Sequence, residues 1–182
     1  VVNATGINSD KVRRMAVQDI DERILSSRGT HIVLRNKICA QGKGLLIPST
    51  EDNRMLFVLP YFGRTLVGTT DTACISQDSQ QPSDAEKDYL LKHIRAWFPS
   101  LGEPEVTSSW AGGRPLLKPK EEFKSSNVVR EHEIEVLDSG LISAMGGKWT
   151  TCRCIAIDTL KAIEKIIGRE LPQPKEIPII GI

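Results

Sequence analysis

Gly-Gly-Lys-Trp-Thr-Thr, at residues 146–151, decides how the rest of this sequence is interpreted. The apolar run Leu141–Met145 before it predicts a strand, and the apolar spacing after it predicts a helix that reaches about Ile167. Paired glycines between a strand and a helix let a ligand approach the backbone closely. The free N–H groups and the positive dipole end of the helix favour an anion, and Lys148 adds a cation. A nucleotide phosphate or the electron-rich edge of a flavin would suit this turn, and a plain turn or helix cap is the alternative. The turn is not a P-loop, because it lacks the GxxxxGK[ST] spacing.

The remaining periodicities predict a mixture of strands and helices. Strands are predicted at Val1–Ala4, Arg28–Leu34, Met55–Leu59, Thr65–Gly68, Val106–Trp110, Glu131–Leu137 and Leu141–Met145. A first helix is expected after Asn8 or Ser9, and the capping box Ser83-Asp84-Ala85-Glu86 opens a second. The last helix is expected to bury a stripe formed by Ala156, Leu160, Ile163 and Ile167. This pattern, with hairpins and no repeated βαβ unit, predicts an α+β fold with a mixed, largely antiparallel sheet and flanking helices.

The composition argues against several classes of protein. The 182 residues carry 24 basic and 23 acidic side chains, so the net charge is +1 and no strongly basic nucleic-acid-binding surface is expected. No apolar run approaches the roughly 18 residues of a membrane-spanning helix. The four cysteines form no CxxC motif, which argues for reduced thiols and against a metal site. The chain starts without Met, as if within a strand, so we expect a piece of a longer protein.

Four charged or titratable side chains are candidates for chemistry, and each keeps a structural alternative. His31 lies in a predicted strand and is either a proton acceptor, since the ordinary histidine pKa is about 6.5, or a structural histidine. Arg114, held extended by the proline that follows it, and Arg130 are either bidentate anion clamps or solvated surface arginines. Asp71, between threonines, is either a turn residue or an acceptor for a ligand hydroxyl group.

Six segments occur in one order along the chain. They are Val-Val-Asn-Ala-Thr-Gly (1–6), Gly-Thr-His-Ile-Val-Leu (29–34), Leu-Val-Gly-Thr-Thr-Asp-Thr (66–72), Trp-Ala-Gly-Gly-Arg-Pro-Leu (110–116), Val-Val-Arg-Glu-His (128–132) and Gly-Gly-Lys-Trp-Thr-Thr (146–151). In this order they resemble the flavin-dependent glycerol-3-phosphate dehydrogenases, over nearly the whole chain from residue 1 to about residue 167. The last segment, which precedes a helix, is the most specific member of the set.

The resemblance implies a fragment of a two-domain FAD-dependent oxidoreductase. The N-terminal part of the family holds a Gly-x-Gly-x-x-Gly loop for the FAD pyrophosphate, and that loop is absent from this sequence. We therefore expect residues 1–20 to be the end of an FAD-binding domain and residues 21–145 to be a substrate-binding domain. Residues 146–170 are expected to form a helix that returns to the FAD-binding domain, and residues 171–182 are expected to be a linker to a further C-terminal region.

The resemblance also implies roles for residues at matching positions. It places contacts with FAD at Thr5, Gly6, Gly147, Lys148, Trp149 and Thr150. It makes His31 the active-site histidine beside the flavin, Arg114 and Arg130 the substrate-binding arginines, and Lys148 the active-site lysine. Catalysis is thus expected to depend on His31, Arg114 and Lys148, and substrate binding on Arg114, Arg130 and Lys148.

The implied activity is the oxidation of sn-glycerol 3-phosphate to dihydroxyacetone phosphate. FAD would accept the hydride, and the electrons would pass to a quinone, or to oxygen in an oxidase. His31 is the first candidate for the acceptor of the hydroxyl proton, because an arginine has a pKa above about 12 and is a poor base. Arg130 would hold the phosphate bidentately, and Lys148 would stabilise negative charge on the substrate or the reduced flavin. The isolated chain is expected to be an inactive fragment.

Other interpretations stay open. A glycerophosphate oxidase, or an amino-acid or amine oxidase, would share the fold, and an amino-acid oxidase would need a carboxylate clamp in place of a phosphate clamp. A stand-alone α+β interaction module without enzymatic activity is favoured by the missing glycine loop. For the dehydrogenase a cytoplasmic location is expected. Peripheral attachment to the inner face of the cytoplasmic membrane and assembly into a homo-oligomer are left open.

Overall fold

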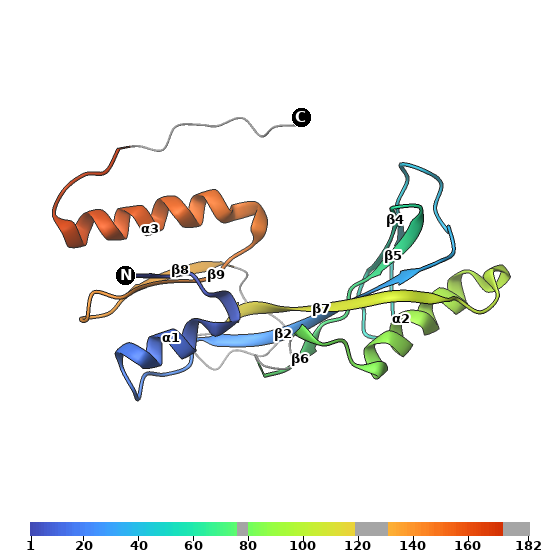
Figure 1. Cartoon of the computed structure of the whole chain (residues 1–182), viewed down its shortest axis with the longest axis horizontal. Helices are drawn as coiled ribbons and strands as arrows, with labels where there is room; N and C mark the ends of the chain where they lie inside the picture. The colour runs from blue at the N-terminus through green and yellow to red at the C-terminus, as the bar shows by residue number, and fades with distance from the viewer. Residues whose placement is uncertain (76–79, 119–130, 173–182) are drawn as a thin grey trace. The chain divides into compact units, whose positions relative to one another are not determined.

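Two units divide the elements of the chain between them. The computed structural model describes residues 1–75, 80–118 and 131–172, and Figure 1 labels the helices and strands. Unit 1 comprises Val1–Leu25 and Pro115–Ile182, and unit 2 comprises Ser26–Arg114. Within the described ranges no helix is long and apolar enough to cross a membrane.

Unit 1 is built on a three-stranded mixed sheet. Its elements are β1 (Val2–Asn3), the 3-10 turn η1 (Gly6–Asn8), α1 (Ser9–Ala16), β8 (His132–Val136), β9 (Ile142–Gly146), the 3-10 turn η4 (Trp149–Thr151) and α3 (Cys152–Ile167). The strand order is β1-β9-β8, with β1 parallel and β8 antiparallel to β9. Figure 1 shows α3 on one side of β8 and β9 and α1 on the other side.

The alternation predicted for β8 separates the two faces of this sheet. His132 points toward α3, where its Nε2 lies 3.0 Å from a carboxylate oxygen of Asp158. Glu133 and Glu135 point to the opposite face, and the carboxylate of Glu135 binds Arg13 of α1. The charged side of β8 therefore faces ionic partners rather than open solvent.

A buried arginine joins α1 to β8. Arg13 is 1% exposed, and its Nε and Nη2 donate to the two carboxylate oxygens of Glu135 at 2.6 and 2.7 Å. Its Nη1 donates to Asp10 Oδ1 at 2.6 Å and to the carbonyl oxygen of Asp21 at 2.7 Å. The other oxygen of Asp10 accepts a hydrogen bond from the Ile24 N–H at 2.8 Å. Because these charges are paired and hydrogen-bonded, the network fixes the path of the chain from α1 as far as Ile24.

Unit 2 is built on a larger sheet. Its elements are β2 (Ile24–Leu34), which begins in unit 1, β3 (Leu45–Ile47), β4 (Leu56–Tyr61), β5 (Arg64–Gly68), β6 (Thr72–Ala73), α2 (Asp84–Trp97), the 3-10 turn η3 (Pro99–Leu101) and β7 (Val106–Leu117), which ends in unit 1. The strand order is β3-β4-β5-β2-β6, and β7 also pairs with β2. The pairings of β2 with β5 and β6, and of β4 with β3 and β5, are antiparallel. The expected α+β class, with mixed and antiparallel sheets and flanking helices, is confirmed.

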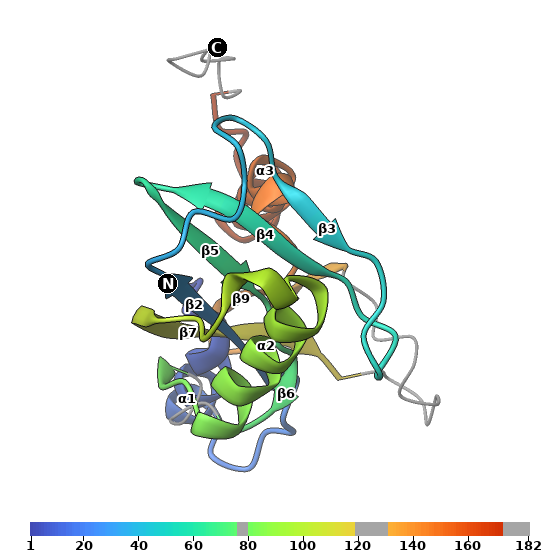
Figure 2. The same ribbon diagram turned by 90° about the vertical axis from the view of Figure 1, so that its right-hand side faces the viewer.

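Helix α2 lies across one face of the unit 2 sheet (Figure 2) and builds the core there. The helix begins at the predicted capping box, in which the Ser83 hydroxyl and the Glu86 carboxylate bond each other's backbone N–H groups. The buried side chains of this core are Ile32, Leu34, Ile47, Leu56, Val58, Val67, Leu90, Leu91 and Ile94. The opposite face of the sheet is open, and Phe57 and Leu59 of β4 are exposed.

A buried carboxylate joins α2 to β2 and to the segment after β5. Glu86 is 5% exposed, and its Oε2 lies 2.7 Å from Arg28 Nε and accepts from the Thr30 hydroxyl at 3.0 Å. Its Oε1 accepts from the Thr70 hydroxyl at 2.8 Å. Ser83 adds the capping-box bonds at the start of α2. The capping glutamate is thus also the polar centre of unit 2.

Several predicted strand boundaries are wrong. Strand β2 begins at Ile24 rather than Arg28, and β7 continues through Gly112 to Leu117 rather than ending at the glycine pair. Strands β3 and β6 were not predicted, because runs of three and two residues are too short to show a periodicity. Pairing with long neighbouring strands decides these boundaries, and a single sequence does not reveal that pairing.

The stripe predicted for α3 is correct only in part, because Leu160 and Ile163 are partly buried and its two end residues are exposed. Ala156 is exposed and Ile167 is 45% exposed, whereas Thr159 is buried. The Thr159 hydroxyl donates to the carbonyl oxygen of Ile155 at 2.8 Å, so its burial leaves no polar group without a partner. Because α3 carries apolar side chains around most of its circumference, their spacing did not identify the face that packs on β8 and β9.

Replacing Arg13 with Met should destabilise the chain strongly. The change leaves the carboxylates of Asp10 and Glu135 without their charged partner, and breaking a buried ion pair costs about 3–5 kcal/mol. Urea unfolding followed by circular dichroism measures the free energy of unfolding. Arg14→Met is the matched control, because Arg14 is exposed and pairs with exposed Glu22, which is worth at most about 1 kcal/mol. Equal losses in the two variants would show that the buried network does not hold α1.

The stability of unit 2 should fall in acid because of Glu86. Burial acts to raise the pKa of Glu86, but hydrogen bonds from the Ser83 N–H and from neighbouring hydroxyl groups outweigh it and lower the pKa from its ordinary 4.5 to about 2. The corresponding stability, about 3 kcal/mol, is present above pH 4.5 and is lost as the pH falls toward 2. Urea unfolding at several pH values between 7 and about 2.5 measures this loss.

Glu86→Gln should flatten this acid dependence, because the amide does not titrate. The control is Glu103→Gln, which removes an exposed carboxylate that pairs with Arg95 and should leave the slope almost unchanged. An acid slope that persists in Glu86→Gln would mean that other carboxylates cause it.

Candidate functional site

The open face of the unit 2 sheet carries two of the predicted site residues. Strand β2 alternates, so Thr30 and Ile32 point toward α2 and are fully buried. Gly29 and His31 therefore lie on the opposite face. Arg114, near the end of β7, reaches the same face over Gly29. Sheet pairing thus brings His31 and Arg114 together from positions 83 residues apart in the sequence.

A glycine makes room for the His31 ring. His31 lies directly opposite Gly68 of β5 in the antiparallel register. A Cβ atom at position 68 would lie within 2.8 Å of His31 Nε2, and closer still to the ring carbon Cδ2. The imidazole also stacks on the indole of Trp110, with ring centroids 5.7 Å apart and planes 13° apart. The ring position therefore depends on Gly68 and Trp110.

A second glycine makes room for Arg114. A Cβ atom at position 29 would lie 2.8 Å from the guanidinium carbon of Arg114. Arg114 Nη2 donates to the carbonyl oxygen of Thr70 at 3.1 Å and to the Thr69 hydroxyl at 3.3 Å, and Nη1 lies 3.5 Å from Asp71 Oδ1. The guanidinium is thus held between β2 and the Thr-Thr-Asp segment that follows β5.

The surroundings of His31 favour its neutral form. Burial lowers the pKa of His31, and the positive charge of Arg114 lowers it further. A neutral imidazole has a nitrogen lone pair that can accept a proton at neutral pH. Of the two alternatives left open for His31, the geometry favours a proton acceptor, although its catalytic role stays a prediction.

Unit 1 holds the predicted cofactor contacts at one edge of its sheet. Strands β1 and β9 are parallel, with Asn3 opposite Ser143. Thr5 and Gly6 follow β1, and Gly147 follows Gly146, the last residue of β9. Both glycines of this pair have positive φ, +71° and +80°. A Cβ atom at position 146 would lie 2.6 Å from the carbonyl oxygen of Glu131. This is a chain path that only glycine follows without strain.

The residues after the glycine pair are open to a ligand. Lys148 and Thr150 are exposed, and Trp149 is 90% exposed. The helix expected after this turn begins at Cys152, because the 3-10 turn η4 precedes α3. The Lys148 N–H donates to the Thr151 hydroxyl at 3.2 Å. Exposed backbone and a cation therefore lie at the carboxyl edge of two parallel strands, where α/β proteins place their ligands.

The predicted site residues thus fall into two groups. His31 and Arg114 lie in unit 2, and the cofactor contacts Thr5, Gly6 and 147–150 lie in unit 1. Arg130 lies outside the described residues. Sequence reasoning missed the slots at Gly29 and Gly68, although a glycine inside a predicted strand is a known sign of close approach.

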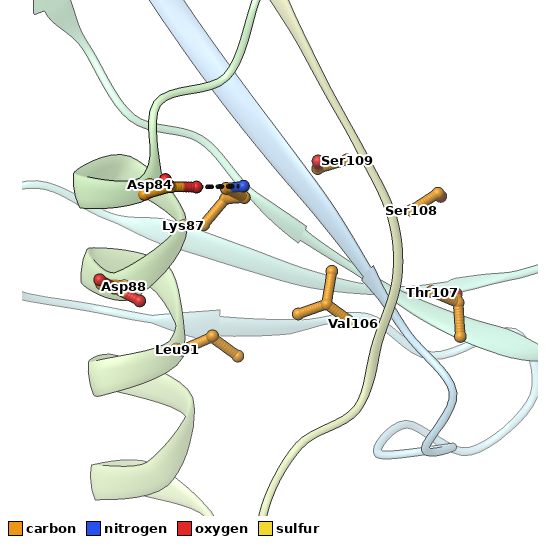
Figure 3. Close-up of a pocket in the computed structure, with 8 residues that line it drawn as sticks. All are labelled: Asp84, Lys87, Asp88, Leu91, Val106, Thr107, Ser108 and Ser109. Carbon is orange, nitrogen blue, oxygen red and sulfur yellow. Dashed lines mark ion pairs between the residues drawn. The ribbon is translucent and has the colours of Figure 1, made fainter.

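A groove between α2 and β7 lies apart from the predicted residues (Figure 3). It encloses about 560 Å³ and is lined by Asp84, Lys87, Asp88, Leu91, Val106, Thr107, Ser108 and Ser109. Lys87 is paired with Asp84 at its rim. No predicted site residue lines the groove, and the residues that line it include no histidine or cysteine. We therefore assign the groove no chemistry.

Comparison with known proteins decides the family. The model of the family described as FAD dependent oxidoreductase matches residues 1–153. This chain belongs to that family. Its curated relatives include a probable glycerol-3-phosphate dehydrogenase of Encephalitozoon cuniculi, 36% identical over 88% of this chain and 26% of the relative. The mitochondrial glycerol-3-phosphate dehydrogenase of Rattus norvegicus is 36% identical over 91% of this chain and 23% of the relative.

Solved structures share the fold of this chain. The glycerol-3-phosphate dehydrogenase of Bacillus halodurans, complexed with FAD, matches 94% of this chain and 33% of its own, with a TM-score of 0.77 and 32% identity. The glycine oxidase of Geobacillus kaustophilus matches with a TM-score of 0.56 at 18% identity, which shows the fold alone. The resemblance to glycerol-3-phosphate dehydrogenases is confirmed, and the chain spans about a quarter of the length of the curated relatives.

Gly68→Ala should displace His31. The added methyl group overlaps the imidazole, and overpacking of this kind costs about 1–3 kcal/mol. Urea unfolding measures the loss of stability, and the NMR signals of the His31 ring report its departure from Trp110. Gly112→Ala is the control, because a Cβ atom there meets nothing within 4 Å. An unmoved His31 signal in Gly68→Ala would mean that the slot does not position the ring.

Proposed function

We propose that this chain is part of a flavoenzyme that oxidises sn-glycerol 3-phosphate to dihydroxyacetone phosphate. The observation that carries the proposal is the placement of His31, whose pKa is lowered by burial and by Arg114, beside a fixed Arg114 on the open face of unit 2. The curated relatives named above, each 36% identical to this chain, are glycerol-3-phosphate dehydrogenases, and the solved structure that matches with a TM-score of 0.77 is complexed with FAD. A secondary alcohol needs a proton acceptor and a positive group near its oxygen, and these two residues fit those roles.

The unit 1 residues fit an FAD molecule. The positive-φ pair Gly146 and Gly147 exposes backbone without side chains, and Thr5, Lys148 and Thr150 add two hydroxyl groups and a cation at the same edge. These residues would hold the flavin end of FAD, because a cation and N–H groups stabilise the negative charge of a reduced flavin. When bound, FAD would supply the hydride acceptor for the reaction.

The side chains of unit 2 would handle the proton. A ring nitrogen of His31 takes the proton of the substrate hydroxyl group as the carbon–hydrogen bond breaks. Arg114 binds the same oxygen and favours its partial negative charge. Trp110, stacked on His31, keeps water from one side of the ring. The substrate phosphate is assigned to Arg130, as the family resemblance implies.

The electron acceptor, the catalytic residues and the location of the complete enzyme are part of the same proposal. The electrons would pass from the flavin to a quinone, as in the dehydrogenases, and oxygen as the acceptor would make the protein a glycerophosphate oxidase. The catalytic set would be His31, Arg114 and Lys148. The cytoplasmic location stays a prediction, since the relative of Rattus norvegicus is mitochondrial. The isolated 182-residue chain would itself be inactive, because the Gly-x-Gly-x-x-Gly loop is absent from it.

The function is tested by mixing the complete flavoenzyme anaerobically with candidate substrates. We expect sn-glycerol 3-phosphate to reduce the flavin rapidly after mixing, which is measured as the loss of flavin absorbance. Glycerol should reduce it far more slowly, because it has no phosphate for an arginine to bind. Bleaching by glycine or another amino acid, with none by glycerol 3-phosphate, would overturn the proposal in favour of an amino-acid oxidase.

The role of His31 is tested in the same experiment. His31→Gln should slow flavin reduction by about 10²–10⁴-fold, the usual contribution of a general base. In the unchanged enzyme the rate should fall as the pH drops through a pKa below the ordinary histidine value, since protonated His31 accepts no proton. His132→Gln, which alters the pair with Asp158 in unit 1, should leave the rate nearly unchanged. Equal effects of the two substitutions would remove His31 from catalysis.

A further inference from the structure

Asp71 lies between two arginines in unit 2. It follows Thr69 and Thr70, just before β6, and its two carboxylate oxygens face different partners. Oδ1 accepts a hydrogen bond from the Ser27 hydroxyl and lies 3.5 Å from Arg114 Nη1. Oδ2 lies 3.7 Å from Arg54 Nη1. The carboxylate therefore bridges the site arginine Arg114 and an arginine of the neighbouring loop.

The two ends of the Arg114 guanidinium are held differently. Nη2 donates to the Thr70 carbonyl oxygen and to the Thr69 hydroxyl. Nη1 is buried, makes no hydrogen bond within the described residues, and faces the carboxylate of Asp71. A buried guanidinium nitrogen is stable only near a compensating charge. Asp71 supplies that charge at the end of the side chain that Thr69 and Thr70 do not hold.

Arg54 holds Asp71 from its other side. Its Nη1 donates to the backbone carbonyl oxygen of Asp71 at 2.8 Å, and its Nε lies 2.9 Å from Asp52 Oδ2. Asp52 in turn accepts from the Tyr89 hydroxyl of α2 at 2.7 Å. Arg54 is therefore tied to α2, and the position of Asp71 is set from the helix side of the sheet.

We propose that Asp71 is a positioning residue, whose carboxylate keeps the Arg114 guanidinium seated against Gly29 and beside His31. The inference rests on the proposed function for its catalytic meaning, since it assigns no contact between Asp71 and substrate. Of the two alternatives left open for Asp71, a turn residue and an acceptor for a ligand hydroxyl group, neither describes these contacts. The bridge to Arg114 is a third role.

The sign of one measurable change separates this role from simple charge screening. The positive charge of Arg114 contributes to the lowered pKa of His31. If Asp71 seats Arg114, then removing Asp71 lets the guanidinium leave, and the pKa of His31 rises. If Asp71 only screens a guanidinium that stays in place, removing it strengthens the positive field, and the pKa of His31 falls.

The first experiment titrates the histidine ring signals of the 182-residue chain by NMR. Asp71→Ala should raise the pKa of His31, and so should Arg114→Met. Adding Asp71→Ala to Arg114→Met should then change the pKa no further, because both substitutions remove the same interaction. Glu103→Ala is the control, since it removes an exposed carboxylate that pairs with Arg95 and should leave the pKa of His31 unchanged. An unchanged or lowered His31 pKa in Asp71→Ala would overturn the proposal.

One readout and one further variant distinguish the proposed effect from unfolding of the chain. The ring signals of His93, which contacts Tyr89, and of His132, which contacts Asp158, belong to other parts of the chain, so unchanged chemical shifts for them show that a variant is folded. Should Asp71→Ala unfold, Asp71→Asn keeps a partner for the Ser27 hydroxyl and removes only the charge. It must then give the same rise in the His31 pKa. A folded Asp71→Asn variant with an unchanged His31 pKa would equally overturn the proposal.

The second experiment measures steady-state kinetics of the complete flavoenzyme. Asp71→Asn should lower kcat/KM for sn-glycerol 3-phosphate on the order of tenfold, a typical coupling for groups in contact, and should shift the acidic limb of the pH profile upward with His31. If kcat/KM were unchanged and the acidic limb of the pH profile did not shift, Asp71 would have no part in catalysis through Arg114. Absence of any activity toward glycerol 3-phosphate in the unchanged enzyme would sink the proposed function, while the NMR result still decides whether Asp71 positions Arg114.

Discussion

The carboxylate of Glu86 holds together the three elements that support the unit 2 site. It lies at the start of α2, binds Arg28 and Thr30 of β2, and accepts a hydrogen bond from Thr70 after β5. Each of these partners is next in sequence to a site position, since Thr30 stands between Gly29 and His31 and Thr70 precedes Asp71. A buried carboxylate without partners would cost several kcal/mol. The site geometry is therefore tied to the requirement that this charge be satisfied.

One face of the unit 2 sheet packs against α2 and contributes stability, and the opposite face carries the candidate site residues His31 and Arg114. On the α2 face, large apolar side chains such as Ile32 and Val67 pack at full burial. On the other face, glycines at positions 29 and 68 leave room for a guanidinium and an imidazole. Strand alternation requires this division, because each residue of β2 that points toward the core is followed by one that points to the open face.

Local sequence signals predicted part of this structure well. The capping box at Ser83 located the start of α2, and charge alternation separated the faces of β8. These signals lie within a few residues, so a single sequence contains them. The motif around Gly146 and Gly147 likewise marked the sheet edge where the chain turns with positive φ.

Contacts between distant segments could not be predicted in the same way. The buried face of α3 depends on which strands lie beneath it, and the ion pair between Arg13 and Glu135 joins residues 122 positions apart. In the candidate site, His31 and Arg114 were identified as individual residues. Their arrangement needs the register that sets His31 opposite Gly68, and no local pattern specifies that register.

The close fit of His31 against Gly68 has a consequence for how such a protein can evolve. A side chain at position 68 is excluded while the imidazole is in place, so single-step replacements of that glycine meet a steric barrier. Once the histidine is exchanged for a small residue, the barrier disappears and position 68 becomes free to drift. Descendants that no longer need the imidazole should therefore lose the histidine first and the glycine afterwards, and the order of the two losses would record when the histidine stopped being required.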